Sequence, residues 1–346
     1  MRVGIVNDTA IAMEALRRII AAVPDFEIAW LARDGEQALL RTAEDLPDII
    51  LMDLYMPVMD GVESTRRIMA SNPCAILIVT ASVEGNASKV FEALGAGAVD
   101  SMPTPVLADG ARAADGASLV AKIRTIGRLT GKSHVPASVI SQWIATAPGP
   151  PAIDGEAQVV VIGCSAGGPP ALAEIVHQLP VDFPPVVIVQ HIDAEFASGM
   201  AEWLNGHSPI PVHLAYAGES LSPGNIYVAG TGNHLVFTGP RTVGYSPPVD
   251  DAIYCPCIDV CLLSLLRHLR GRVAAAILTG MGRDGAAGLK ALRAAGAYTI
   301  AQDRGTSAVF GMPKAAAEMN AAEAVLPLSE IVPAMVKYFA RERANA

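Results

Sequence analysis

Three polar residues in the C-terminal half of the chain, Ser165, His191 and Asp284, have types that could support nucleophilic catalysis. Ser165 lies in the turn GCSAGG, where Gly163, Ser165 and Gly167 satisfy the G-x-S-x-G pattern that exposes a hydroxyl above a sheet. A serine needs a base to become a useful nucleophile, and the base needs an orienting acid. His191 and Asp284 each follow a strongly apolar stretch, so they are the candidate base and acid.

Each of these residues also has an ordinary structural interpretation. The turn could bind a phosphate, but the residues that a dinucleotide fingerprint or a P-loop requires are absent here. A lone histidine after a strand is more often a hydrogen-bonded structural residue, and Asp284 could simply cap the following helix. Because all three residues follow apolar strands, we expect the strands to bring them to one sheet edge. This shared placement favours a hydrolase.

A second group of polar residues, near the N-terminus, could bind a metal ion and accept a phosphoryl group. Asn7 and Asp8 follow the first apolar stretch, Asp53 follows IILM, and Thr80 ends AILIVT. Two carboxylates and a hydroxyl at strand ends form a hard oxygen site suited to Mg²⁺, with one carboxylate free to attack phosphorus. Asp53 and Asp60 could instead cap turns. The combination of positions favours the phosphoryl site.

Two successive α/β domains must position these residues. From residue 1 to 125, short apolar stretches alternate with amphipathic ones, which predicts a doubly wound, flavodoxin-like sheet of five parallel strands. Residues 126–157 are rich in Pro, Gly, Ala and Ser and predict a linker. A second series over 158–346 predicts a doubly wound, mostly parallel α/β domain, with a hairpin in NIYVAGTGNHLVFTG.

Composition excludes several classes of function. The 346 residues carry a formal net charge of -9 without a block of basic residues, so we expect no nucleic-acid partner. The apolar runs are too short to span a bilayer and no signal-peptide pattern is visible, which predicts a cytoplasmic protein without membrane insertion. Cys255, Cys257 and Cys261 match no zinc-binding pattern, so we interpret this cluster as structural.

The stretches IVND, LMDLYMPVMDGVE, IVT and GAGAVDSMPTP resemble the receiver domain of two-component response regulators, over residues 1 to about 125. The resemblance implies that Asp53 is the phospho-acceptor and that Thr80 is the switch hydroxyl. It also implies that Asp8, Asp53 and the backbone carbonyl of Tyr55 bind Mg²⁺, and that a CheA-type histidine kinase donates the phosphoryl group.

Two positions depart from the receiver pattern. Asn7 replaces the first residue of the usual acidic pair, and Thr104 stands before Pro105 where the family has a lysine. The loss of that lysine removes a cation that would pair with the phosphoryl group. We therefore expect phosphorylation of Asp53 to be slow, short-lived or weakly coupled to output; a receiver that accepts no phosphate would act as a docking module.

The stretches IGCSAGGPPAL, IVQHIDAEFASGMAEWL, ILTGMGRDGAAGLKALRAAG and IAQDRGTSAVFGMPKAA closely resemble the catalytic domain of the chemotaxis methylesterase CheB, over about residues 156–340. The resemblance implies that Ser165 is the nucleophile, His191 the general base and Asp284 the residue that orients it. The implied substrate is a glutamate 5-methyl ester on the cytoplasmic helices of a methyl-accepting chemoreceptor, and glutamine deamidation is a second implied activity. No cofactor is expected at this site.

The backbone amides of Ala166 and Met281 are the candidate oxyanion donors. Ala166 replaces a threonine that is common in the family, and Cys255 and Cys257 replace the arginine and serine of an Arg-Pro-Ser pattern. Loss of the arginine predicts weaker capture of an acidic receptor segment. VND and the non-lysine loop resemble the Wsp-type branch of the family, which implies a surface-sensing receptor array.

The sequence is also compatible with two other classes of function. A non-catalytic adaptor would dock on receptors or on the kinase and would not need Ser165. A small-molecule serine esterase would hydrolyse generic acyl esters without receptor helices.

Overall fold

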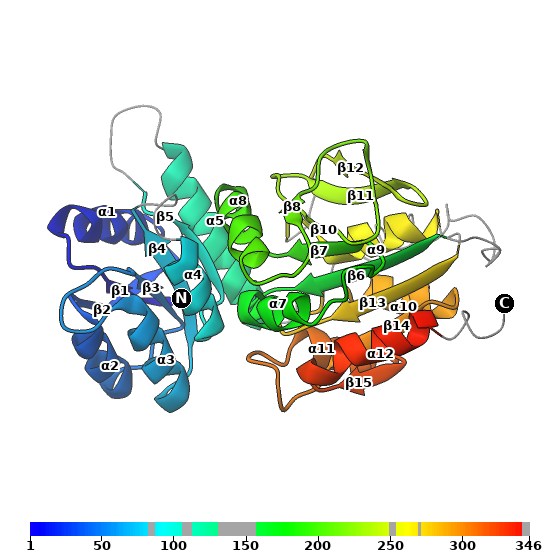
Figure 1. The fold of residues 1–346 in the computed structure, drawn as a ribbon. Helices are drawn as coiled ribbons and strands as arrows, with labels where there is room; N and C mark the ends of the chain where they lie inside the picture. Colours follow the sequence, from blue (N-terminus) through cyan, green and yellow to red (C-terminus); the bar gives the residue numbers. More distant parts are fainter. Residues whose placement is uncertain (82–86, 106–112, 131–156, 249–253, 269–270, 341–346) are drawn as a thin grey trace. The chain divides into compact units, whose positions relative to one another are not determined.

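The computed structural model forms two compact units, Met1–Lys132 and Ser133–Ala346. The last helix of the first unit ends at Thr130, beyond the domain limit predicted at residue 125. Most of the predicted linker, 126–157, lies outside the described residues. The structure describes the whole chain except residues 82–86, 106–112, 131–156, 249–253, 269–270 and 341–346 (Figure 1).

Strands and helices alternate along the described part of the N-terminal unit. The strands Ile49–Met52 and Ala75–Thr80 are buried along their whole length, as expected for the central strands of a parallel sheet. In chain order the elements are β1 (Arg2–Val6), α1 (Ala10–Ala21), β2 (Glu27–Ala32), α2 (Gly35–Glu44), β3 (Ile49–Met52), α3 (Gly61–Ser71), β4 (Ala75–Thr80), α4 (Ala87–Gly95), β5 (Asp100–Pro103) and α5 (Ala113–Thr130).

The sheet of this unit has the strand order β2-β1-β3-β4-β5, and every neighbouring pair is parallel. Helix α1 packs against α5, whereas α2, α3 and α4 pack in succession on the other face (Figure 1). Asp60 caps the start of α3 by accepting a hydrogen bond from the Glu63 N–H at 3.0 Å. The structure therefore confirms the predicted five-stranded, doubly wound sheet, and it gives Asp60 the capping role.

The C-terminal unit also alternates strands with helices. Among the described helices of the chain, none is both long and apolar enough to cross a membrane. In chain order the elements are β6 (Gln158–Cys164), α7 (Gly168–His177), β7 (Val186–Gln190), α8 (Ala194–Asn205), β8 (Val212–Leu214), β9 (Glu219–Ser220), β10 (Ile226–Val228), β11 (His234–Gly239), β12 (Thr242–Ser246), α9 (Ile258–Leu266), β13 (Arg272–Ile277), α10 (Ala286–Ala294), β14 (Tyr298–Gln302), α11 (Met312–Glu318), β15 (Ala324–Leu326) and α12 (Leu328–Ala340).

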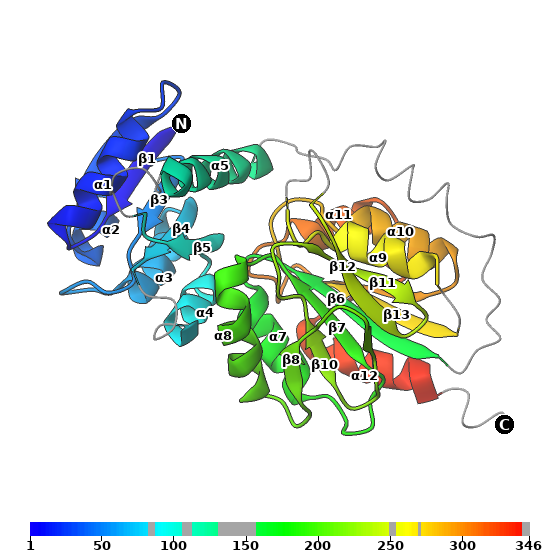
Figure 2. The same ribbon diagram turned by 90° about the horizontal axis from the view of Figure 1, so that it is seen from above.

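Seven parallel strands form the main sheet of this unit, in the order β15-β14-β13-β6-β7-β10-β8. Helices α9 and α10 cover one face, and α7, α8 and α12 cover the other (Figure 2). From β6 the chain builds outward through β7 to one edge and later through β13 to the other. The strand order therefore switches between β6 and β13, and ligands of open α/β sheets bind beyond the carboxyl ends at such a point.

The predicted hairpin in NIYVAGTGNHLVFTG is wrong. Strand β10 lies in the main sheet between β7 and β8, whereas β11 pairs antiparallel with β12 in a separate sheet of order β11-β12-β9. The three residues of β10 are completely buried, and parallel partners on both sides satisfy their backbone groups. The short apolar run could not reveal which sheet it joins.

Candidate active site

Ser165 lies directly after β6, in the tight turn that leads into α7. Its N–H donates to the Thr279 carbonyl oxygen at 3.0 Å, and its own carbonyl accepts from the Gly168 N–H at 2.8 Å. Gly167 has a φ of 75°, a left-handed conformation that favours glycine. The turn between β6 and α7 therefore provides the strand–turn–helix context that the G-x-S-x-G pattern requires. Only 5% of the surface of Ser165 is exposed.

His191 follows β7, the neighbour of β6. Cys164 and Gln190 are paired in the parallel register of these strands, and the His191 N–H donates to the Cys164 carbonyl at 3.0 Å. Gln190 Nε2 also donates to the carbonyl of Ser165 at 2.9 Å. Ser165 and His191 thus come directly after a registered pair of residues, which brings the two backbones side by side at the carboxyl edge of the sheet.

The side chain of His191 is bound to Asp284, which follows β13. His191 Nε2 lies 2.7 Å from Asp284 Oδ2, and both residues are buried. Because an ionised carboxylate only accepts hydrogen bonds, Nε2 carries the proton and Nδ1 keeps its lone pair. Nδ1 is buried and has no hydrogen-bond partner among the described residues. The described contacts include no hydrogen bond from Ser165 Oγ to His191, so the structure forms one of the two links of the predicted triad.

The carboxylate of Asp284 lies at the start of α9. It accepts hydrogen bonds from the Ile258 N–H at 2.7 Å, from the Asp259 N–H at 2.9 Å and from the Gly285 N–H at 2.9 Å. Burial opposes ionisation, but the hydrogen bond and charge of His191 and the amides of α9 hold the pKa of Asp284 below its ordinary value. Asp284 is therefore held as an anion that orients the imidazole.

Sequence reasoning missed two side chains that contact this pair. The Tyr254 ring stacks on the His191 imidazole, with centroids 3.7 Å apart and planes 13° apart, and its hydroxyl donates to the Met281 carbonyl at 3.4 Å. Cys257 Sγ lies 3.1 Å from Asp284 Oδ1. Burial and the nearby charge of Asp284 raise the pKa of the Cys257 thiol well above its ordinary value, so the thiol stays protonated and donates.

The candidate oxyanion donors lie near Ser165 in chain and space: Ala166 follows it directly, and Met281 follows Gly280, where a Cβ atom would lie 2.8 Å from Ser165 Cβ. In the described part of the chain, neither the Ala166 N–H nor the Met281 N–H donates a hydrogen bond to another backbone group, whereas the Ser165 N–H is bound to Thr279. The Thr279 hydroxyl donates to the Ala166 carbonyl at 2.9 Å, which fixes the turn after the nucleophile. The two amides therefore have the hydrogen-bonding capacity that an oxyanion requires.

The N-terminal unit brings Asn7 and Asp53 together at the carboxyl edge of its sheet. Asn7 Nδ2 donates to Asp53 Oδ2 at 2.8 Å, and the Leu54 N–H donates to Asp53 Oδ1 at 2.7 Å. Burial raises the pKa of Asp53 to about 6, against the lowering effect of the backbone N–H groups, and the charge of Asp8 raises it further. The charges of Asp8 and Asp53 repel each other here, and a bound divalent cation would offset this repulsion.

The other predicted receiver residues lie around this pair. Asp8 and Tyr55 are exposed, Tyr55 lies two positions after Asp53, and Thr80 is buried at the end of β4. The Thr104 N–H donates to the Thr80 carbonyl at 2.9 Å, and its buried hydroxyl has no partner among the described residues. In the described part of the chain, no group of three or more His, Cys, Asp or Glu side chains could hold a metal ion. Mg²⁺ would therefore depend on Asp8, Asp53 and a carbonyl oxygen.

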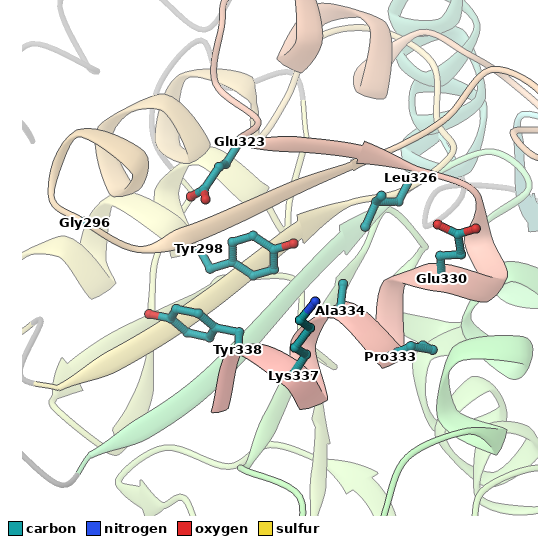
Figure 3. Close-up of a pocket in the computed structure, with 9 residues that line it drawn as sticks. All are labelled: Gly296, Tyr298, Glu323, Leu326, Glu330, Pro333, Ala334, Lys337 and Tyr338. Carbon is teal, nitrogen blue, oxygen red and sulfur yellow. The ribbon is translucent and has the colours of Figure 1, made fainter. Parts of the chain in front are cut away.

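A cavity of about 570 Å³ lies elsewhere in the C-terminal unit, between β14, β15 and α12 (Figure 3). The rings of Tyr298 and Tyr338 stack with centroids 5.1 Å apart in its wall. None of the predicted site residues lines this cavity. Its lining residues are Gly296, Tyr298, Glu323, Leu326, Glu330, Pro333, Ala334, Lys337 and Tyr338.

Comparison with known proteins identifies both units. Residues 160–335 match the family described as CheB methylesterase, and residues 3–110 match the response regulator receiver domain. The chain is 52% identical to the protein-glutamate methylesterase/protein-glutamine glutaminase 1 of Bordetella avium, over 98% of both chains. A protein of Cupriavidus pinatubonensis with the same name is 49% identical over 97% of both chains.

The fold comparison agrees with the sequence comparison. The crystal structure of the Thermotoga maritima CheB methylesterase catalytic domain is 33% identical, with a TM-score of 0.51, and it covers 53% of this chain and 100% of that chain. These findings do not distinguish a Wsp-type branch, so that assignment stays a prediction. A receiver unit followed by a methylesterase unit matches the two α/β units described above, and the chain belongs to the CheB methylesterase family.

Proposed function

We propose that the chain removes methyl groups from glutamate 5-methyl esters of chemoreceptors, with Ser165 as nucleophile, His191 as general base and Asp284 as the orienting acid. The observation that carries this proposal is the buried 2.7 Å contact between His191 Nε2 and Asp284, directly beside the turn that presents Ser165. It leaves His191 Nδ1 as the acceptor for the serine proton.

The reaction follows from these positions. Ser165 Oγ attacks the ester carbonyl while His191 Nδ1 takes its proton, and the Ala166 and Met281 amides stabilise the resulting oxyanion. Collapse expels methoxide, which takes the proton from His191 and leaves as methanol. Water then attacks the acyl-enzyme, again with His191 as base, and releases the glutamate carboxylate and free Ser165. A receptor glutamine presents the same acyl centre with ammonia as the leaving group, so deamidation follows the same steps.

The receiver unit supplies the regulation in this proposal. A CheA-type histidine kinase would transfer a phosphoryl group to Asp53, and bound Mg²⁺ would screen the charge between the carboxylate and the phosphoryl oxygens. Asp8, Asp53 and the Tyr55 carbonyl would hold the ion, and Thr80 would bind the phosphoryl group. These partners place the protein in the cytoplasm, beside the cytoplasmic helices of its receptors. The sequence likeness to the Wsp-type branch favours a surface-sensing receptor array.

Methanol release from membranes that carry methylated receptors tests this function. We expect Ser165→Ala and His191→Ala each to lower the rate by at least about 10³-fold, because the members of such a triad act as a unit. An adaptor would leave methanol release at background for the natural chain as well. A small-molecule esterase would hydrolyse a generic acyl ester but not the receptor, and either result would overturn the proposal.

A further inference from the structure

Arg283 lies next to Asp284 in sequence and has no ion-pair partner in the part of the chain that the structure describes. It is partly exposed and directly precedes Asp284, and its guanidinium makes no hydrogen bond or ion pair with any described residue. Two other arginines of this unit have structural contacts. Arg272 donates to the Phe339 carbonyl, and Arg293 donates to Asn320.

The two ends of the segment that carries Arg283 contact Ser165 and His191. It begins at Thr279, whose carbonyl accepts from the Ser165 N–H at 3.0 Å, and it ends at Asp284, which is 2.7 Å from His191. Met281, a candidate oxyanion donor, is two residues before Arg283. Arg283 therefore lies in the backbone segment that joins the candidate oxyanion donor Met281 to Asp284.

Asp284 does not neutralise this cation. Its two oxygens accept hydrogen bonds from His191, from Cys257 Sγ and from three backbone amides, as described above. The carboxylate is also buried, whereas Arg283 is partly exposed. The guanidinium thus keeps its five N–H donors available to a ligand outside the protein.

The whole chain carries a formal net charge of -9, so an acidic substrate is repelled at long range. A local cation next to the reacting centre is what such a substrate requires for correct docking.

We propose that Arg283 is a specificity-determining residue that binds a carboxylate one helical turn away from the methylated glutamate on the receptor helix. This inference rests on the proposed function. Residues three or four positions apart lie on the same face of a helix, so an ester held at Ser165 presents its neighbouring carboxylates to the same rim. An arginine binds a carboxylate through two parallel hydrogen bonds, which fixes the register of the helix as well as its affinity.

Two methylated cytoplasmic fragments of a chemoreceptor test the inference, one with glutamates and one with alanines one turn from the methyl ester. Alanine is used because glutamine could itself be deamidated. At low salt the full-length natural chain should have a kcat/KM about tenfold higher for the acidic fragment than for the alanine fragment, because its KM for the acidic fragment is lower. Arg283→Ala should erase the preference, Arg283→Lys should keep part of it, and Arg283→Glu should reverse it. High salt should weaken it.

Arg241 offers a matched control, because it is an exposed arginine at the turn between β11 and β12. Arg241→Glu should keep the natural preference. A preference that survives in Arg283→Ala, or an equal loss of kcat on both fragments, would overturn the role of Arg283 and leave the proposed function intact. If the natural chain released no methanol from either fragment, the proposed function and this inference would both fail.

Discussion

At the scale of single residues, the surroundings of two buried carboxylates at the start of α9 shift their pKa values in opposite directions. Asp284 has the imidazole and three amides as donors, which hold its pKa below the ordinary value. Burial and the charge of Asp284 raise the pKa of Asp259 well above the ordinary value, although the Gly288 N–H donates to it at 2.7 Å. Ionisation of Asp259 is therefore disfavoured beside the charge of Asp284, and the surroundings favour the negative charge on Asp284, where it contacts His191.

The Cys257 thiol donates a hydrogen bond to the Asp284 carboxylate, and substitution of Cys257 tests what this bond contributes. We expect Cys257→Ala to lower kcat by about fivefold, the effect of one hydrogen bond to a buried group. With one donor fewer, the Asp284 charge acts more strongly on the imidazole, so the acid limb of the kcat/KM profile should move to higher pH. The pH profile of methanol release measures both effects.

Cys257→Ser is the matched control, because a hydroxyl donates to the same oxygen. It should keep the rate and the pH profile of the natural chain. A serine variant that behaved like the alanine variant would show that packing of the thiol, and not its hydrogen bond, supports Asp284.

The sequence predicts some of these residue contacts and not others. Ser165, His191 and Asp284 each follow an apolar strand, so parallel-sheet geometry was sufficient to place them at one edge. The stacking of Tyr254 on His191 and the bond from Cys257 come from a segment that precedes a helix and lies at no strand end. The local sequence does not indicate which side chains of this segment face the site. These contacts are therefore seen only in the folded structure.

At the scale of elements, the position of Asp284 depends on how closely α9 packs on the sheet. Gly163 in β6 makes this packing close, since a Cβ atom there would lie 2.5 Å from Ile258 Cγ2. Ile258 is the first residue of α9, and its N–H holds Asp284. The glycine of the G-x-S-x-G pattern therefore also sets the distance between a helix start and the catalytic acid.

Gly163→Ala should consequently displace α9 and weaken catalysis as well as stability. We expect a loss of about 1–3 kcal/mol in the free energy of unfolding from overpacking, together with a lower kcat. Thermal unfolding and methanol release measure the two effects. The double variant Gly163→Ala with Ile258→Ala should lose less stability than the sum of the single variants, because the clashing methyl group is gone. Strict additivity would contradict the packing argument.

Strand prediction succeeded where apolar strands alternate with helices, and the pairing was wrong where β10 and β11 follow each other without a helix between them. The alternating apolar and amphipathic stretches were enough for the five-stranded receiver sheet, and β6, β7 and β13 were recognisable as buried strands. The error at β10 and β11 arose because their pairing depends on residues distant in sequence. Two short apolar runs with a turn between them are compatible with a hairpin or with membership of two sheets.

At the scale of the whole molecule, two units carry two sites of different chemistry. Asp53 lies at the edge of one sheet, and Ser165 lies at the edge of the other. Each unit has its own core, so either site can form without the other. Phosphorylation can change the rate of hydrolysis only by the free energy with which the phosphoryl group distinguishes an active from an inactive state of the chain.

This coupling should depend on pH through Asp53. Attack on a phosphodonor needs the ionised carboxylate, and burial raises the pKa of Asp53 to about 6, so the reactive fraction falls as the pH falls through that value. With acetyl phosphate and limiting Mg²⁺, methanol release by the full chain should be stimulated at neutral pH, and the stimulation should fade below pH 6. More Mg²⁺ should shift the loss to lower pH, because the cation favours the carboxylate.

The fragment 158–346 separates this effect from the pH dependence of the hydrolytic site, because it contains Ser165, His191 and Asp284 but no receiver. It should release methanol without any response to acetyl phosphate, and the ratio of stimulated to unstimulated rates in the full chain then reports Asp53 alone. Asp53→Asn should remove the stimulation, since an amide cannot attack phosphorus. Stimulation that persisted in Asp53→Asn, or that did not change as the pH fell below 6, would mean that regulation acts through a different group.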